Sequence, residues 1–198
     1  MHDGHGDDHG GHRGAHRDRG LHRGHAAGHD ESGPAHEHKA HAPARVNAFV
    51  ITSSDTRTEA SDDSGRLIKE KLEAAGHGVA GHRVVRDEPS ELRQALEEAA
   101  SAGAGAVIIN GGTGIGRRDQ TIETLRPMLE KELPGFGEIF RTLSFEEIGS
   151  PAMFSRALAG TWRGMILFAL PGSPQAARLA MDELILPELG HAVRELTR

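Results

Sequence analysis

The chain of 198 residues contains no cysteine and no long apolar run. Without cysteine it cannot form a disulfide, a thiolate nucleophile or a cysteine-ligated zinc site. No apolar stretch approaches the roughly 20 residues that a membrane-spanning helix needs. We therefore expect a cytoplasmic protein that does not enter a membrane.

Basic charge is also lacking, because the formal net charge is −6 and neither residues 1–44 nor residues 45–198 are net positive. Neither part has the basic surface that nucleic-acid binding requires. Residues 1–44 hold eleven of the fourteen histidines, nine glycines and one large aliphatic residue, Leu21. Such a segment buries too little apolar surface to offset the entropy of ordering it. We expect a disordered tail over 1–44 and one folded domain over 45–198.

Two sets of histidines in this tail, one from His2 to His16 and one from His22 to His29, recur at intervals of three and four residues. On a helix this spacing would place each set on one face, where its members could share Ni²⁺ or Zn²⁺. The glycines oppose a free helix, so metal binding would have to impose the structure. The alternative is a solvated low-complexity tail without a specific role. The candidate ligands are His2, His5, His9, His12, His16, His22, His25 and His29.

From Arg45 onward, strand-like and helix-like segments alternate, as apolar periodicity indicates. The expected strands are Val46–Thr52, Val79–Val85, Ala106–Ile109 and Met165–Leu170. The expected helices are Ser64–Ala75, Ser90–Ala100, a short one begun by Thr121, Gly135–Phe145, Ala152–Leu158, Gln175–Leu186 and Glu188–Leu196, the last two split at Pro187. This alternation predicts an α/β fold with a mostly parallel sheet covered on both faces.

In open sheets of this kind, ligands bind beyond the carboxyl ends of the strands. The segments expected at that edge are Ser53–Thr56, Arg86–Glu88, Asn110–Asp119 and Pro171–Pro174. Their convergence predicts the location of the site better than any single motif does.

The segment Asn110–Thr121 contains a glycine loop that follows an apolar run. Glycines allow backbone N–H groups to approach phosphates closely. The loop is not a Walker A motif, because no Gly-Lys-Ser/Thr follows, and its glycine spacing does not match a dinucleotide fingerprint. A tight turn without a ligand remains the alternative.

The charged residues that follow the glycines indicate a phosphate-binding site. Arg117 and Arg118 are predicted to contact phosphates, and Asp119 is predicted to bind Mg²⁺. Asp87, at the end of another expected strand, would bring a second carboxylate to the same cation. The alternatives are a solvated charged turn for Arg117–Asp119 and a helix cap for Asp87.

No side chain stands out as a catalytic nucleophile or base. The histidines after residue 44, His77, His82 and His191, lie outside the four loops. A base is dispensable if the attacking group is already an anion, such as a substrate phosphate. Nucleotidyl transfer then needs mainly alignment and charge neutralisation by metal, arginine and backbone N–H groups.

Five motifs follow one another between Val46 and Leu196: Gly111-Gly112-Thr113-Gly114, Arg118-Asp119-x-Thr121, Pro134-Gly135-Phe136-Gly137-Glu138, Ser155-Arg156 and Pro171-Gly172-Ser173-Pro174. In their order and spacing they resemble the MoaB/MogA family of molybdenum cofactor biosynthesis proteins, which is related to the gephyrin G domain. Ser54-Asp55 and Asp63-x-Gly65 are similar to the opening loop of that family, and the branch most similar is MoaB.

The resemblance implies a three-layer α/β/α fold assembled as a homotrimer or homohexamer. It also implies molybdopterin adenylyltransferase activity, in which the terminal phosphate of molybdopterin attacks the α-phosphate of MgATP and pyrophosphate leaves. Asp87 and Asp119 would be the essential acidic pair. The implied nucleotide- and molybdopterin-binding residues are Ser54, Asp55, Asp63, Gly111, Gly112, Thr113, Gly114, Arg117, Arg118, Thr121, Gly137, Glu138, Ser155, Arg156, Pro171, Gly172 and Ser173.

Two other functions are compatible with the sequence. One is a non-catalytic molybdopterin- or nucleotide-binding protein of cofactor assembly. The other is nickel or zinc handling through the histidine-rich tail, with the domain as an oligomeric platform.

Overall fold

The computed structural model describes residues 45–198. The predicted disorder of residues 1–44, and the metal-binding role of their histidines, lie outside the described residues. The predicted folded domain, residues 45–198, spans the residues that the structure describes.

Six strands form one sheet in the order β2-β1-β3-β6-β5-β4. The four strands that were expected form its parallel part, because β1 pairs in parallel with β2 and β3, and β3 pairs in parallel with β6. Two further strands extend the sheet in antiparallel orientation. The strands are β1 (Asn47–Ser53), β2 (Gly78–Val85), β3 (Ala106–Asn110), β4 (Lys131–Glu132), β5 (Leu158–Trp162) and β6 (Met165–Leu170).

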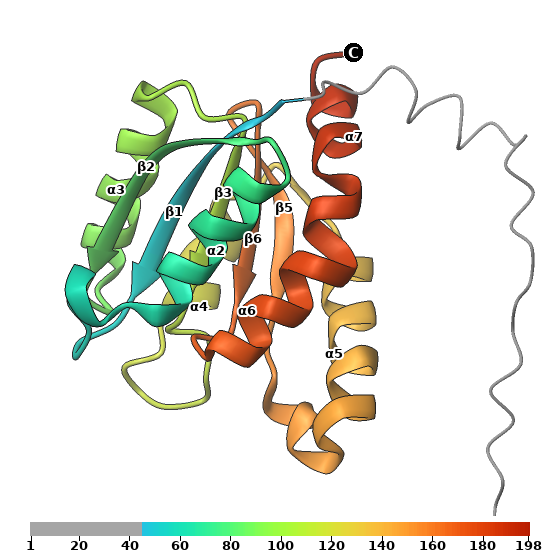
Figure 1. Cartoon of the computed structure of the whole chain (residues 1–198). Coiled ribbons are helices and arrows are strands. Elements are labelled where there is room, and N and C mark those ends of the chain that lie inside the picture. The colour runs from blue at the N-terminus through green and yellow to red at the C-terminus, as the bar shows by residue number, and fades with distance from the viewer. Residues whose placement is uncertain (1–44) are drawn as a thin grey trace, which may run out of the picture. The chain divides into compact units, whose positions relative to one another are not determined.

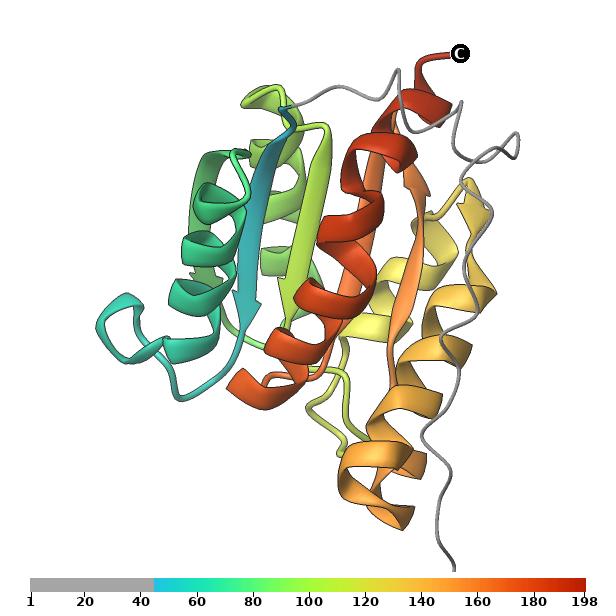
Figure 2. The same ribbon diagram turned by 45° about the vertical axis from the view of Figure 1, so that its right-hand side comes forward.

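Helices cover both faces of this sheet (Figures 1 and 2). One face packs against α2 (Asp63–Ala74), α5 (Pro134–Ile148), α6 (Pro174–Ala180) and α7 (Leu186–Leu196). The other face packs against α3 (Pro89–Ser101) and α4 (Thr121–Leu125). The predicted α/β fold with a mostly parallel, doubly covered sheet is therefore confirmed. Over residues 45–198, no helix has both the length and the apolar character needed to cross a bilayer.

The expected helix Ala152–Leu158 is wrong. A short 3-10 helix spans Ser150–Phe154, and the chain then becomes strand β5, whose residues are all buried. Arg163 and Gly164, both with positive φ, form the two-residue turn that pairs Trp162 with Met165. Such a turn is typical of a tight β-hairpin. The apolar spacing of residues 152–158 suited a helix, but the hairpin partner β6 makes the following residues a strand.

The expected break at Pro187 is also wrong. The helix α6 continues through a π-helical turn, Met181–Ile185, directly into α7. Pro187 follows this turn as the second residue of α7, at the point where the regular α-helical hydrogen-bond pattern is already interrupted. The wide turn before the proline lets the helix continue, and both segments cover the sheet as one rod (Figure 1).

A buried polar network fixes the start of α2 against the sheet. Asp62 caps the helix by accepting a hydrogen bond from the Gly65 N–H group at 2.9 Å. Its carboxylate also accepts a 2.5 Å bond from Thr52 Oγ1 and lies 2.9 Å from His82 Nε2. Burial alone would raise the pKa of Asp62, but these hydrogen bonds outweigh burial and lower it. The charged carboxylate is therefore the form that the fold stabilises.

This network predicts unequal roles for two adjacent aspartates. Asp62→Ala should lower the free energy of unfolding by about 2–4 kcal/mol at pH 7, because it removes a helix cap and leaves buried donors unpaired. Asp63→Ala should change it by less than about 0.5 kcal/mol, because Asp63 is exposed and its ion pair is a surface pair with Arg66 on the same helix. Urea denaturation of both variants measures the difference, and equal losses would contradict the assigned roles.

Candidate functional site

A cavity of about 360 Å³ lies at the carboxyl edge of the parallel strands. All four loops expected at this edge contribute residues to its wall. The lining residues are Ser53, Ser54, Thr56, Arg57, Asp87, Gly111, Gly112, Thr113, Gly114, Asp119, Phe154, Pro171 and Gly172.

Two glycines bring the loop after β3 against the end of β1. Gly111 and Gly112 have φ values of +95° and +61°, which other residues rarely adopt. A Cβ atom on Gly111 would lie 2.2 Å from the Ser53 carbonyl oxygen. A Cβ atom on Gly112 would lie 2.4 Å from Thr121 Oγ1 and 2.5 Å from Asp87 Oδ1. Only glycine therefore allows this close packing of backbone and side chains.

Asp87 lies in the loop after β2, and its carboxylate is close to Ser53 and Gly112. Its Oδ1 accepts a 2.7 Å hydrogen bond from Ser53 Oγ. Burial raises the pKa of Asp87, and the nearby carboxylates of Asp55 and Asp119 raise it further. The cavity therefore concentrates negative charge, and a bound cation would relieve this repulsion.

Asp119 fixes the end of the glycine loop through its carboxylate. Its Oδ2 accepts a 2.7 Å hydrogen bond from the Gly116 N–H group, and the same carboxylate lies beside Gly114. Among residues 45–198, no group of three or more histidine, aspartate or glutamate side chains converges as a metal site. Mg²⁺ commonly binds one or two carboxylates together with substrate phosphates and water. The pair of Asp87 and Asp119 fits that mode of binding.

The two arginines expected to contact phosphates do not line the cavity. Arg118 is held on the surface by Asp55, at 2.9 and 3.0 Å, and by Glu88 at 2.7 Å. This guanidinium holds the pKa of Asp55 below its usual value. Arg117 lies at the exposed tip of the loop. The lining of this cavity contains a different arginine, Arg57, from the loop after β1.

Three other predicted residues stabilise the segments that form the wall of the cavity. Thr121 donates from Oγ1 to the Gly111 carbonyl oxygen at 2.9 Å, and Arg156 donates to the Gly114 carbonyl oxygen at 2.9 Å. Ser173 caps α6 by accepting a hydrogen bond from the Ala176 N–H group. These residues position the wall without lining the cavity.

The remaining predicted residues lie elsewhere. Asp63 is exposed on α2, and the buried aspartate is its neighbour Asp62. Gly137 packs α5 against the Ala157 carbonyl oxygen, where a Cβ atom would lie 2.8 Å away. Glu138 and Ser155 line other depressions of the surface.

Sequence reasoning missed Ser53, Thr56, Arg57 and Phe154 as lining residues. Ser53 and Thr56 belong to the segment that was expected at this edge, and Arg57 follows it directly, so the signal for these three was their position at the end of β1 or just after it. Phe154 carried no such signal. It reaches the cavity from the end of the 3-10 helix that follows α5.

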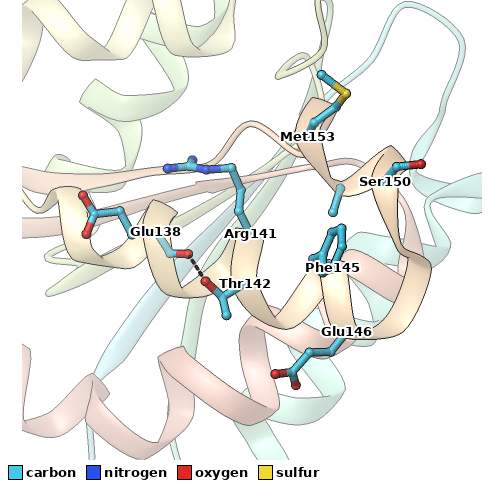
Figure 3. A pocket seen from close by; sticks show the side chains of 8 residues that line it. Glu138, Arg141, Thr142, Phe145, Glu146, Ser150 and Met153 are labelled. Atoms are coloured by element: carbon cyan, nitrogen blue, oxygen red, sulfur yellow. Dashed lines mark hydrogen bonds between the residues drawn. The ribbon is translucent and has the colours of Figure 1, made fainter. Parts of the chain in front are cut away.

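A second, larger cavity of about 760 Å³ lies on the outer surface of α5 and the following 3-10 helix (Figure 3). Its wall includes Arg141, Phe145 and Met153, together with Glu138, whose carbonyl oxygen accepts a hydrogen bond from Thr142. The surface here is unusually apolar. Ile139, Phe145, Ile148, Met153 and Phe154 are between 42% and 72% exposed.

An open, mostly parallel sheet with a glycine-lined cavity at its carboxyl edge defines an α/β ligand-binding domain. This chain belongs to the family described as "probable molybdopterin binding domain", whose sequence profile matches residues 49–191. The predicted membership of the MoaB/MogA family is thereby confirmed.

Individual relatives agree with this assignment. The chain is 50% identical to "Molybdenum cofactor biosynthesis protein B" of Halalkalibacterium halodurans over 164 residues, which cover 82% of this chain and 96% of the relative. A crystal structure of "Molybdenum cofactor biosynthesis protein B" matches with a TM-score of 0.76 and 48% identity, over 79% of this chain and 99% of the other. The "tungsten cofactor synthesizing protein MoaB" of Pyrococcus furiosus matches with a TM-score of 0.73 and 39% identity, over 79% and 100%.

The electrostatics of the cavity predict that Asp87→Asn raises the melting temperature at pH 7. The raised pKa of Asp87 means that its ionised form destabilises the fold, and this cost is fully present above the folded pKa. As the pH falls through the folded pKa toward the ordinary value of 3.8, the wild-type residue protonates and the advantage of the variant disappears.

Thermal unfolding monitored by circular dichroism between pH 4 and pH 8 checks this trend. Asp63→Asn is the matched control, because it removes an exposed carboxylate and should leave the melting temperature nearly unchanged. A stabilisation by Asp87→Asn that grows as the pH falls would contradict the assignment.

Proposed function

We propose that this protein acts in molybdenum cofactor biosynthesis by adenylylating molybdopterin with MgATP. The observation that supports this most directly is the pair of carboxylates, Asp87 and Asp119, set against the glycine loop at one cavity. Membership of the molybdopterin-binding family and the names of the relatives supply the substrate class.

In this reaction an oxygen of the terminal phosphate of molybdopterin forms a bond to the α-phosphorus of ATP. The bond between the α-phosphorus and the bridging oxygen breaks, and pyrophosphate leaves with the electron pair. Because the nucleophile is already an anion, the site needs no general base. This requirement agrees with the lining of the cavity, to which no histidine of residues 45–198 contributes.

The residues of the chain would then align the reactants and balance their charge. Asp87 and Asp119 would hold Mg²⁺, which neutralises the phosphates and the leaving pyrophosphate when bound. The backbone at Gly111, Gly112 and Gly114 would approach the phosphates closely, since these residues carry no side chain. The hydrogen bond from Ser53 keeps Asp87 facing the cavity.

A turnover assay tests this function. Purified protein given MgATP and molybdopterin should release pyrophosphate, and Asp119→Ala should reduce the rate by about 100-fold or more, because one of two charge-balancing carboxylates is lost. Asp63→Ala should retain the wild-type rate, since that carboxylate lies outside the cavity.

Two outcomes would contradict the proposal. Equal rates for Asp119→Ala and wild type would remove the acidic pair from the mechanism. Binding of molybdopterin and ATP without any pyrophosphate release would instead assign a non-catalytic role in cofactor assembly.

We further propose that the protein functions as a homo-oligomer, a trimer or a hexamer, through the apolar surface of α5 and its following 3-10 helix. Large apolar side chains exposed side by side commonly mark a protein interface. Phe145 and Met153, which are 60% and 72% exposed, line the same depression of this surface as Arg141 (Figure 3). A second copy of the chain would bury them.

Phe145→Glu should shift the protein toward the monomer, because a charge in an apolar interface costs desolvation energy. Gln94→Glu, on the exposed surface of α3 across the sheet, is the matched control and should leave the assembly unchanged. Sedimentation velocity measures both. A wild-type monomer, or a Phe145→Glu oligomer of unchanged size, would refute the assigned interface.

A further inference from the structure

We propose that Arg57 is the side chain that binds the phosphate groups of the ligand in the glycine-lined cavity, in place of Arg117 and Arg118. The ligand class would be a polyphosphate, such as a nucleoside triphosphate or pyrophosphate, with a divalent cation. This inference rests on the proposed function, because it specifies how the same cavity recognises its substrate.

The position of Arg57 carries the first part of the argument. It belongs to the loop after β1, yet its guanidinium reaches the loop after β6, since a Cβ atom on Gly172 would lie 3.6 Å from Nη1. The side chain is 29% exposed and lines the same cavity as Asp87 and Asp119. A phosphate chain that lies along the glycine loop would therefore meet a guanidinium and two carboxylates in one cavity.

The hydrogen bonds of Arg57 carry the second part. Its Nη1 lies 3.4 Å from Ser64 Oγ and 3.9 Å from Asp62 Oδ1, so neither partner binds it tightly. The carboxylate of Asp62 makes shorter bonds to Thr52 and to the Gly65 N–H group, at 2.5 and 2.9 Å. Asp62 therefore attracts the guanidinium without occupying its donors. A guanidinium has five N–H donors in a planar fork that suits phosphate oxygens.

Arg118 shows the opposite arrangement. Two carboxylates already occupy its guanidinium, with distances of 2.7 to 3.0 Å, and it does not line the cavity. Its role is to neutralise Asp55 and Glu88 at the rim. Binding a phosphate through Arg118 would first require breaking these ion pairs, whereas Arg57 needs no such step.

Isothermal titration of the full chain with pyrophosphate and with ATP, each in the presence of Mg²⁺, tests the inference. Arg57→Ala should lower the affinity for both ligands by about 10-fold or more, as expected for losing charge-assisted hydrogen bonds. Arg57→Lys should recover part of the affinity, because the charge returns without the fork. Arg117→Ala and the α3 surface variant Arg93→Ala should stay within about 2-fold of wild type.

The result that overturns the inference is wild-type affinity in Arg57→Ala, an equal loss in Arg117→Ala, or no binding of either ligand by the unaltered chain. If Arg57→Ala does not fold, as thermal unfolding would reveal, the Arg57→Lys variant decides: wild-type affinity there overturns the assigned fork, and weakened binding supports it. The outcome is independent of turnover. Arg57-dependent binding without pyrophosphate release would support the inference while refuting the adenylylation reaction, and turnover with Arg57-independent binding would do the reverse.

Discussion

The hydrogen bonds of Thr52 at the end of β1 are the contact on which the site depends. Its hydroxyl donates to Asp62 and accepts a 2.7 Å bond from the side chain of Asn110 at the end of β3. All three residues are buried. One side chain thereby joins two strand ends to the start of α2. The loops that continue from these points form the cavity, so their spacing is set by a contact outside it.

The distribution of charge around the cavity follows a consistent pattern. At the rim, Arg118 neutralises two carboxylates. Inside, the one arginine of residues 45–198 that lines the cavity with Asp87 and Asp119 is Arg57, which is only loosely paired. A site that leaves its own charges unbalanced loses some stability and gains affinity for a ligand that balances them. A polyphosphate with its cation carries both signs of charge and would satisfy both sets of residues.

The sequence was sufficient for the parallel half of the fold and insufficient for the rest. The strands β1, β2, β3 and β6 are apolar runs with clear boundaries, so local pattern alone located them. β5 was missed because helical apolar spacing came directly before it, and only pairing with β6 makes it a strand. The predicted break at Pro187 was wrong because a π-helical turn directly before the proline allows the helix to continue.

By itself, the sequence determined which loops meet at the carboxyl edge and that glycines and two aspartates occur there, because parallel strands bring such loops together wherever the pattern repeats. Tertiary structure alone decided which charged side chain faces inward. Of two adjacent aspartates, Asp62 is buried as a cap and Asp63 is solvated. Of the arginines, Arg57 lines the cavity and Arg118 pairs with Asp55 and Glu88. The physical reason is that burial and ion pairing depend on neighbours that are far away in the chain.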